Sequence, residues 1–171
     1  MKKNLLGEII IEASDYAKKV VKMFVEQDGI RFAPNPNKVR GFYYWNDTTF
    51  PKFKGKCQLI YCIYKDGRPI YVGCSRQKSG NGLYARISRF CCQLTGNTKT
   101  GGEHPGAKKY KILFDEDYSN LYVKYYSLCE NDKYNISLEE VEQEVIRILM
   151  PVCNNEIYKS NWTAMARLEL A

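Results

Sequence analysis

Residues 59–73 read LIYCIYKDGRPIYVG, and this stretch carries the strongest structural signal in the chain. Two runs rich in β-branched and aromatic residues are typical of β-strands. Between them lies Asp66-Gly67, a dipeptide that tolerates the positive φ angles of a tight hairpin turn. The stretch therefore predicts an antiparallel β-hairpin. Because side chains alternate between the two faces of a strand, Tyr61 and Tyr71 could point to the same face of this hairpin.

Outside the hairpin, apolar residues recur at the three-to-four spacing of amphipathic helices in three segments. Ser137 and Glu140 form a capping-box pattern at the start of the last of these segments. A fourth segment is rich in β-branched and aromatic residues and predicts a strand. The predicted helices span residues 5–25, 83–90 and 138–149, and the predicted strand spans residues 121–128. Together with the hairpin, these elements predict an α+β fold, a small, mainly antiparallel β-sheet flanked by helices.

The chain between residues 30 and 55 carries three prolines and several asparagines and aromatic residues, which predicts an irregular arm. Its aromatic and basic side chains could stack on nucleic acid and grip it, and they could equally pack the arm onto the core. We expect three parts: an N-terminal helix and arm over residues 1–56, a core over 57–155, and a C-terminal helix over 156–171 that packs on the core. The Gly- and Thr-rich stretch 95–106 predicts a mobile loop.

The charge of the chain is polarised along its length. The 171 residues include 26 Lys and Arg against 19 Asp and Glu, a net charge of +7. Residues 51–111 hold thirteen basic and two acidic side chains, whereas residues 112–171 hold five basic and eleven acidic ones. A concentrated basic segment suits an anionic partner such as nucleic acid, although a solvated basic face is an equally common interpretation.

Seven cysteines and one histidine restrict the kinds of metal site that the chain can form. No two cysteines have the CxxC spacing of a zinc site, so a structural zinc site is not expected. Some of the cysteines lie within apolar runs, where a free thiol packs as a small hydrophobic group, and this favours a reducing compartment. No apolar run reaches membrane-spanning length. We therefore expect a cytoplasmic protein without a membrane partner.

Five short motifs follow one another in the order found in the GIY-YIG nuclease superfamily. That family has Gly-Ile-Tyr and Tyr-Ile-Gly on a hairpin, Leu-x-x-Arg on a helix, Glu on a second helix and then Pro-x-x-Asn. The corresponding positions here are Leu59-Ile60-Tyr61, Tyr71-Val72-Gly73, Leu83-Tyr84-Ala85-Arg86, Glu142 and Pro151-Val152-Cys153-Asn154. Over about residues 57–155, the chain therefore resembles this superfamily, and in particular its small type II restriction endonucleases.

The resemblance implies a catalytic role for five residues. Tyr61 would accept the proton of the attacking water, and Tyr71 would help to position that water. Arg86 would grip the phosphate through its guanidinium fork. Glu142 would bind a Mg²⁺ or Mn²⁺ ion, and Asn154 would orient groups around that ion.

Two questions about these residues stay open at the level of sequence. A tyrosine, with a pKa of about 10, is a poor base unless a cation lowers that pKa, and Arg86, Lys65 or the metal could do so. Glu144 competes with Glu142 as the metal ligand because the two lie within one turn of the same predicted helix. We favour Glu142 because it lies nine residues before Pro151, as in members of the family that the chain resembles.

The chain departs from the family pattern at two positions. Leu59 stands where the family has glycine, and Phe90 stands where many members carry a histidine or a tyrosine. The second departure removes a proton-transfer group. His104 and Tyr84 are candidate replacements, although a lone loop histidine is more often simply exposed. Further polar side chains are expected to contact the DNA backbone, namely Ser75, Arg76, Lys78, Arg89, Lys108 and Lys109.

These features predict a metal-dependent endonuclease that hydrolyses phosphodiester bonds in double-stranded DNA. The helix and arm before the hairpin favour a site-specific, restriction-type enzyme. One alternative is a structure-specific repair nuclease. The other is a catalytically inactive nucleic-acid-binding protein with the same fold, and the departures from the family pattern at Leu59 and Phe90 keep this alternative open. With one site per chain, we expect a homodimer on DNA or sequential nicking of the two strands.

Overall fold

The computed structural model of the chain describes residues 2–35, 37, 42–44, 57–77, 82–96, 104–128 and 137–154. Most of the predicted arm, the predicted C-terminal helix over 156–171, most of the predicted loop and Lys78 lie outside the described residues. Within the described ranges, no helix combines the length and the apolar character that crossing a membrane requires.

The described part of the chain contains four helices and five strands. The helices are α1 (Lys2–Glu26), α2 (Gly82–Leu94), α3 (Pro105–Phe114) and α4 (Leu138–Leu149). The strands are β1 (Ile30–Pro34), β2 (Phe42–Tyr44), β3 (Cys57–Lys65), β4 (Arg68–Gln77) and β5 (Leu121–Leu128). They form one sheet in the order β2-β1-β5-β3-β4, and every neighbouring pair is antiparallel. The predicted α+β fold, an antiparallel sheet flanked by helices, is confirmed.

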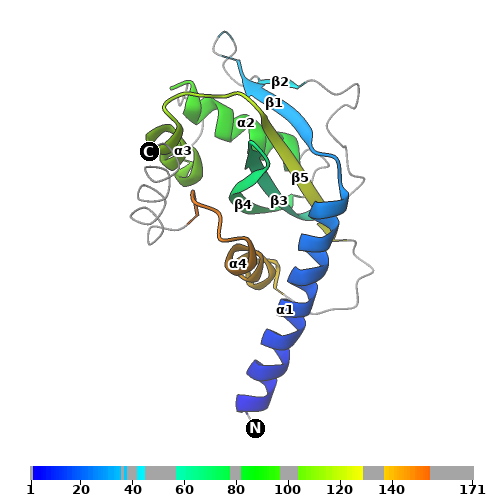
Figure 1. The fold of residues 1–171 in the computed structure, drawn as a ribbon. Helices are drawn as coiled ribbons and strands as arrows, with labels where there is room; N and C mark the ends of the chain where they lie inside the picture. Colours follow the sequence, from blue (N-terminus) through cyan, green and yellow to red (C-terminus); the bar gives the residue numbers. More distant parts are fainter. Residues whose placement is uncertain are drawn as a thin grey trace, which may run out of the picture.

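The sheet lies between two pairs of helices, α2 with α3 and α1 with α4 (Figure 1). In β3, the odd-numbered residues from 59 to 63 pack with buried side chains of α2 and α3. The even-numbered residues from 60 to 64 pack with buried side chains of α1 and α4. Because both faces of β3 are buried, its sequence is a continuous apolar run and does not alternate with polar residues.

The turn of the β3–β4 hairpin lies at Asp66-Gly67, as predicted, with φ angles of 50° and 81°. The pairing register shifts between Ile63 and Tyr64, so that Ile70 on β4 has no partner across the ladder. This extra residue makes a β-bulge, a feature that changes the direction of nearby side chains and is frequent next to functional sites.

Beyond the bulge, the register of the hairpin fixes the relation between the two motif tyrosines. Tyr61 pairs with Gly73, and Ile63 pairs with Tyr71. Directly opposed residues of an antiparallel pair share a face, so Tyr61 and Tyr71 are diagonal neighbours on one face. Both pack with the cluster of α2 and α3, which confirms that they point to the same side of the hairpin.

Three expectations about segments outside the hairpin are wrong: the extent of the arm, the end of the loop before α3 and the capping of α4. The predicted irregular arm begins with β1, whose Ile30 and Phe32 are buried in the core, so residue 56 does not divide the arm from the sheet. The predicted loop ends early, because α3 begins at Pro105. Ser137 is the N-cap residue of α4, but its hydroxyl bonds to the side chain of Glu139 and makes no capping hydrogen bond.

Candidate active site

Two tyrosines of the hairpin form the centre of the candidate site. The ring centroids of Tyr61 and Tyr71 are 6.2 Å apart, and their phenol groups hydrogen-bond to each other. Tyr61 is buried, with 2% of its surface exposed, and Tyr71 is half-buried. Gly73 makes this arrangement possible, because a Cβ atom at that position would lie 2.5 Å from the Tyr61 hydroxyl oxygen. The glycine of the second motif therefore provides the room that the Tyr61 ring occupies.

Arg86 brings a positive charge to the two tyrosines from α2. Its side chain is half-buried, and its Nε atom has no hydrogen-bond partner among the described residues. Burial raises the pKa of both Tyr61 and Tyr71, and the Arg86 guanidinium acts on both in the opposite direction. Because a buried donor without a partner is costly, this guanidinium is suited to bind an anionic oxygen.

Glu142 reaches the same place from α4, on the other side of the sheet. Since β4 is the edge strand, α4 can present Glu142 at that edge, where its carboxylate accepts hydrogen bonds from the N–H and the thiol of Cys74. Burial raises the pKa of Glu142, and the charge of Arg86 acts in the opposite direction. Burial is the largest cause of the raised pKa of Tyr61 and Tyr71, and the negative charge of Glu142 raises both pKa values further. The fold thus brings these four predicted residues within electrostatic reach of one another.

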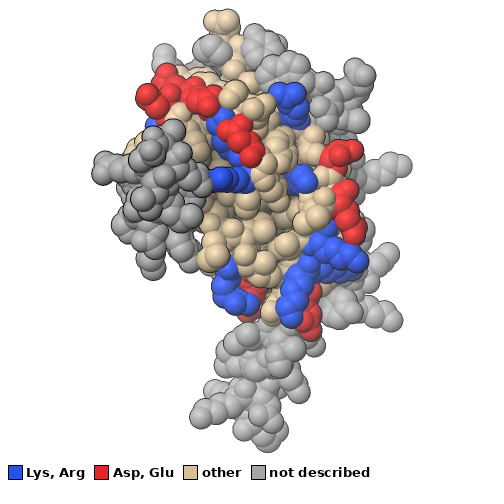
Figure 2. All heavy atoms as spheres, in the orientation of Figure 1, with Lys and Arg blue, Asp and Glu red and all other residues tan. Residues whose placement is uncertain are grey.

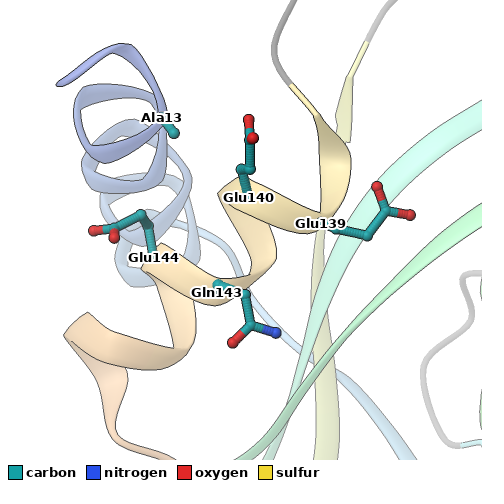
Figure 3. Close-up of a pocket in the computed structure, with 5 residues that line it drawn as sticks. All are labelled: Ala13, Glu139, Glu140, Gln143 and Glu144. Carbon is teal, nitrogen blue, oxygen red and sulfur yellow. The ribbon is translucent and has the colours of Figure 1, made fainter. Parts of the chain in front are cut away.

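Glu144 points elsewhere. Its carboxylate pairs with the Arg147 guanidinium at 2.9 Å. It also lines a pocket of about 250 Å³ between α1 and α4, together with Ala13 and three other side chains of α4 (Figure 3). None of the predicted catalytic residues is among the described lining of this pocket. Glu142, and not Glu144, is the carboxylate that the fold places beside the tyrosines.

Lys65 is held away from the tyrosines by its own partners. Its ammonium group is buried at the turn end of the hairpin, 2.7 Å from Asp66 and 2.8 Å from Asp117. It also donates a hydrogen bond of 3.0 Å to the Ser119 hydroxyl. The prediction of Lys65 as an auxiliary residue of the site is therefore wrong, because two carboxylates already neutralise its charge.

Burial dominates the titration of both phenols. It raises the pKa of Tyr61 well above its usual range and that of Tyr71 to about 12. Arg86 opposes this effect without overcoming it, so both tyrosines are protonated at neutral pH. For Tyr61 to accept a proton, further positive charge has to enter the site.

Asn154 holds the edge of β4. Its Oδ1 accepts a hydrogen bond from the Val72 N–H at 2.7 Å, and its Nδ2 donates to the Val72 carbonyl at 2.7 Å. On the same edge, the Cys153 N–H donates to the Ile70 carbonyl at 2.8 Å. These bonds occupy the edge as a neighbouring strand would. Asn154 is therefore a positioning residue for the strand that carries Tyr71, and its contacts do not match the predicted role of orienting groups around a metal.

Replacing Asn154 by leucine is expected to lower the free energy of unfolding by about 1–3 kcal/mol, because the buried N–H and C=O of Val72 lose their partners. Urea denaturation followed by circular dichroism measures this change. Gln143, which is exposed on α4, provides the control, since Gln143→Ala should change the free energy by less than about 0.5 kcal/mol. An Asn154→Leu protein as stable as the unmodified chain would contradict the positioning role.

His104, a candidate auxiliary residue of the site, is buried, so the alternative interpretation of an exposed loop histidine is wrong. It is 4% exposed and is the N-cap residue of α3, where its Nδ1 accepts a hydrogen bond of 3.3 Å from the Ala107 N–H. Its ring lies against Tyr71 and Phe90, with centroid distances of 5.0 and 5.3 Å. Pro105 directly after it was the sequence signal for this helix start, because proline is favoured at the first helical position.

The fold is expected to lose stability as the pH falls from about 6.5 to about 4. Burial lowers the pKa of His104 from 6.5 to about 4, and the charges of Arg86 and Arg89 add to this effect. In this window the unfolded chain binds the proton more readily than the native chain, so His104 contributes a loss of up to about 3 kcal/mol. Thermal unfolding across this pH range should show a weaker pH dependence for His104→Asn. Equal pH dependence in both proteins would contradict the burial of a neutral imidazole.

The basic residues predicted to contact DNA differ in their exposure. Arg89 and Lys108 are exposed, and Lys109 is half-buried. Arg76 is exposed and forms an ion pair with Glu139 of α4. Figure 2 shows basic side chains in separate groups, with acidic side chains between some of them. The face in this view therefore does not carry one continuous basic surface.

Two further predicted residues have opposite environments. Tyr84 is 42% exposed on α2, so its phenol is accessible from solvent. Ser75 is fully buried, and its hydroxyl has no hydrogen-bond partner among the described residues. A phosphate contact requires an accessible side chain, so the prediction for Ser75 is wrong.

Two contributors to the site carry no recognisable signal in the sequence. Cys74 follows the second tyrosine motif directly, and its hydrogen bonds to Glu142 depend on how α4 meets the edge of β4. Gly106 lies in the first turn of α3, and a Cβ atom there would lie 2.3 Å from the Tyr71 ring. Both contacts join segments that are distant along the chain.

Comparison with known proteins gives no match. No protein-family model matches the chain, and neither does any curated protein or any solved structure. The resemblance to the GIY-YIG superfamily therefore rests on the motifs and stays a prediction.

Proposed function

We propose that the chain is a metal-dependent endonuclease that hydrolyses phosphodiester bonds in double-stranded DNA with the site specificity of a restriction enzyme. One observation carries the proposal: Arg86, whose buried Nε has no described partner, lies within electrostatic reach of Glu142 and two phenols. Phosphodiester hydrolysis needs positive charge on the phosphate and an acceptor for the proton of water. The motif resemblance supports the same function.

A Mg²⁺ or Mn²⁺ ion is proposed to bind at Glu142. Burial raises the pKa of this carboxyl, so its charged form is poorly compensated and a cation would stabilise it. Among the described residues, no group of three or more His, Cys, Asp or Glu side chains is arranged to hold a metal. One carboxylate nevertheless suits Mg²⁺, which keeps several waters and takes further ligands from substrate phosphates. When bound, the ion would supply positive charge to the phosphate and acidify a coordinated water.

Four residues of the protein are proposed to bind the phosphate, accept the proton and orient the other groups of the site. Arg86 would bind a nonbridging phosphate oxygen with its guanidinium group. Once positive charge in the loaded site has lowered its pKa, Tyr61 would first release its own proton to solvent, and the resulting phenolate would accept the proton of water. Tyr71, hydrogen-bonded to Tyr61, would fix the direction of that phenol. The N–H and thiol of Cys74 would orient the Glu142 carboxylate.

Exposed basic side chains of α2 and α3 are proposed to hold the DNA backbone. Replacing Arg89 and Lys108 by glutamine should weaken binding of duplex DNA and reduce the slope of log K against log salt by about 1 for each residue. Fluorescence anisotropy at several salt concentrations measures this slope. Lys18→Gln with Lys22→Gln on α1, where both lysines pair with acidic neighbours, should leave it nearly unchanged. Equal slopes for the two double variants would exclude this surface as the binding face.

The two competing functions are separated by a comparison of substrates. Intact plasmid, nicked duplex and flap DNA are each incubated with the full chain and Mg²⁺. The proposal predicts discrete fragments from the intact plasmid. Preferred cutting of the flap would favour a repair nuclease, and binding without any cutting would favour an inactive binding protein. Because each chain carries one such site, cutting both strands requires a homodimer on DNA or two successive nicks.

A further inference from the structure

The first turn of α3 forms a wall of the candidate site. The His104 ring meets the Tyr71 ring edge-on, at a centroid distance of 5.0 Å and an interplanar angle of 61°. Two residues after His104, a Cβ atom on Gly106 would lie 2.3 and 2.5 Å from two ring carbons of Tyr71. The Tyr71 ring is therefore in direct contact with the α3 backbone, and only glycine at position 106 permits this contact.

The His104 ring is itself held firmly. Its Nδ1 accepts a hydrogen bond from the Ala107 N–H at 3.3 Å, and its backbone N–H donates to the Gln93 side chain at 3.4 Å. Its other flank packs edge-on against Phe90 at 5.3 Å. In a neutral imidazole, an accepting Nδ1 places the hydrogen on Nε2. The fold therefore fixes both the orientation of the ring and the position of its hydrogen.

Burial, with a smaller contribution from two arginine side chains, keeps the His104 imidazole neutral. Burial lowers its pKa to about 4, and Arg86 and Arg89 of α2 add to the effect, while Tyr71 faces it from β4. A neutral imidazole can act as a hydrogen-bond donor without adding charge to a site that already holds a guanidinium. His104 can thus remain next to Arg86 without repelling it.

We propose that His104 and Gly106 are positioning residues for Tyr71: His104 holds the phenol ring edge-on, and Gly106 is the surface against which that ring lies. The consequence for cleavage rests on the proposed nuclease function. The placement of the ring does not, because it is a property of the protein without substrate.

Three variants separate this role from simple capping of α3. Asparagine at position 104 keeps a side-chain oxygen that can accept the Ala107 N–H, but it removes the ring from Tyr71. Gly106→Ala improves the helix propensity of α3 and at the same time introduces the clash with Tyr71. Pro105→Ala, at an exposed position in the same turn, is the matched control. Loss of the helix cap would lower the stability of α3, whereas loss of the contact between α3 and Tyr71 would change the position of the Tyr71 ring.

The first measurement uses 3-fluorotyrosine at position 71 and ¹⁹F NMR of the full chain. His104→Asn and Gly106→Ala are each expected to shift or broaden the resonance of residue 71, and Pro105→Ala is expected to leave it in place. A resonance that is unchanged in both variants would overturn the proposal. This readout requires no DNA and no activity.

The second measurement is the Mg²⁺-dependent cleavage of plasmid DNA. His104→Asn and Gly106→Ala are expected to lower kcat by about 10–100-fold with KM within about threefold of the unmodified chain, because a misplaced group costs this much. In a Tyr71→Phe background, each change should have little further effect. Full, multiplied effects in that background would overturn the proposal. If the unmodified chain cuts no DNA while the ¹⁹F resonance still responds, the proposed function fails and the positioning of Tyr71 stands.

Discussion

Replacing Glu142 by glutamine is expected to lower the rate of Mg²⁺-dependent plasmid cleavage by at least about 10³-fold, since the change removes the carboxylate proposed to hold the ion. The fold should survive. Burial raises the pKa of Glu142 above its unfolded value, so its negative charge opposes folding once the pH exceeds that value. Glutamine removes this charge, and the melting temperature at neutral pH should be unchanged or higher.

Glu144→Gln is the control for this experiment. It removes a carboxylate from the same helix, but one that pairs with Arg147 and lines the pocket beside α1. Its cleavage rate should stay within about threefold of the unmodified chain. If Glu142→Gln and Glu144→Gln were equally active, the assignment of Glu142 as the metal ligand would be wrong.

Replacing Arg86 by lysine is expected to lower the single-turnover cleavage rate by about 10²–10³-fold, although the positive charge is retained. The reason lies in the geometry of the group. The described residues leave the buried Nε of Arg86 without a partner, and lysine has no donor at that position and no planar fork for a phosphate. Quenched-flow cleavage with the protein in excess over DNA measures this rate directly.

Arg89→Lys is the matched control, because Arg89 lies on the same helix but is exposed. It should reduce the rate by less than about threefold, with any effect confined to DNA affinity. An Arg86→Lys variant that cuts as fast as the unmodified chain would mean that a positive charge at position 86 is enough for cleavage. The proposed contact between the guanidinium fork and the phosphate would then be excluded.

The elements that local sequence determines were predictable. The hairpin follows from two apolar runs around Asp66-Gly67, and β5 was predicted with the bounds that the structure has, 121–128. The predicted helix from Ser137 to about Leu149 also matches α4. In each case the apolar pattern and the turn or boundary residues lie within one segment, so no distant contact is needed to recognise it.

The features that depend on distant contacts were not predictable. β1 carries prolines and polar residues close by, and its strand conformation becomes evident only when Ile30 pairs with Val123 of β5. The partner of Asn154 is the backbone of Val72, 82 residues earlier in the chain. Propensity and periodicity describe neighbours in sequence, so they contain no information on which segment meets which.

The candidate site shows the same division. Tyr61, Tyr71, Arg86 and Glu142 were predicted from their motifs, with Glu142 preferred to Glu144 for its spacing before Pro151. The structure adds that Glu144 pairs with Arg147. The burial of His104 was not identifiable, because the packing of α3 against β4 decides it. Lys65 was misjudged for a related reason, since its partner Asp117 lies on a distant segment.

The most direct test of the central claim is to map the ends produced from a random-sequence duplex DNA library. The full chain is incubated with the library in the presence of Mg²⁺, in parallel with a chelator control and with Glu142→Gln, and the new ends are sequenced. We predict new ends enriched at one short sequence, present only with Mg²⁺ and the unmodified chain. New ends that are no more frequent with the unmodified chain than with Glu142→Gln or the chelator would contradict the proposed endonuclease.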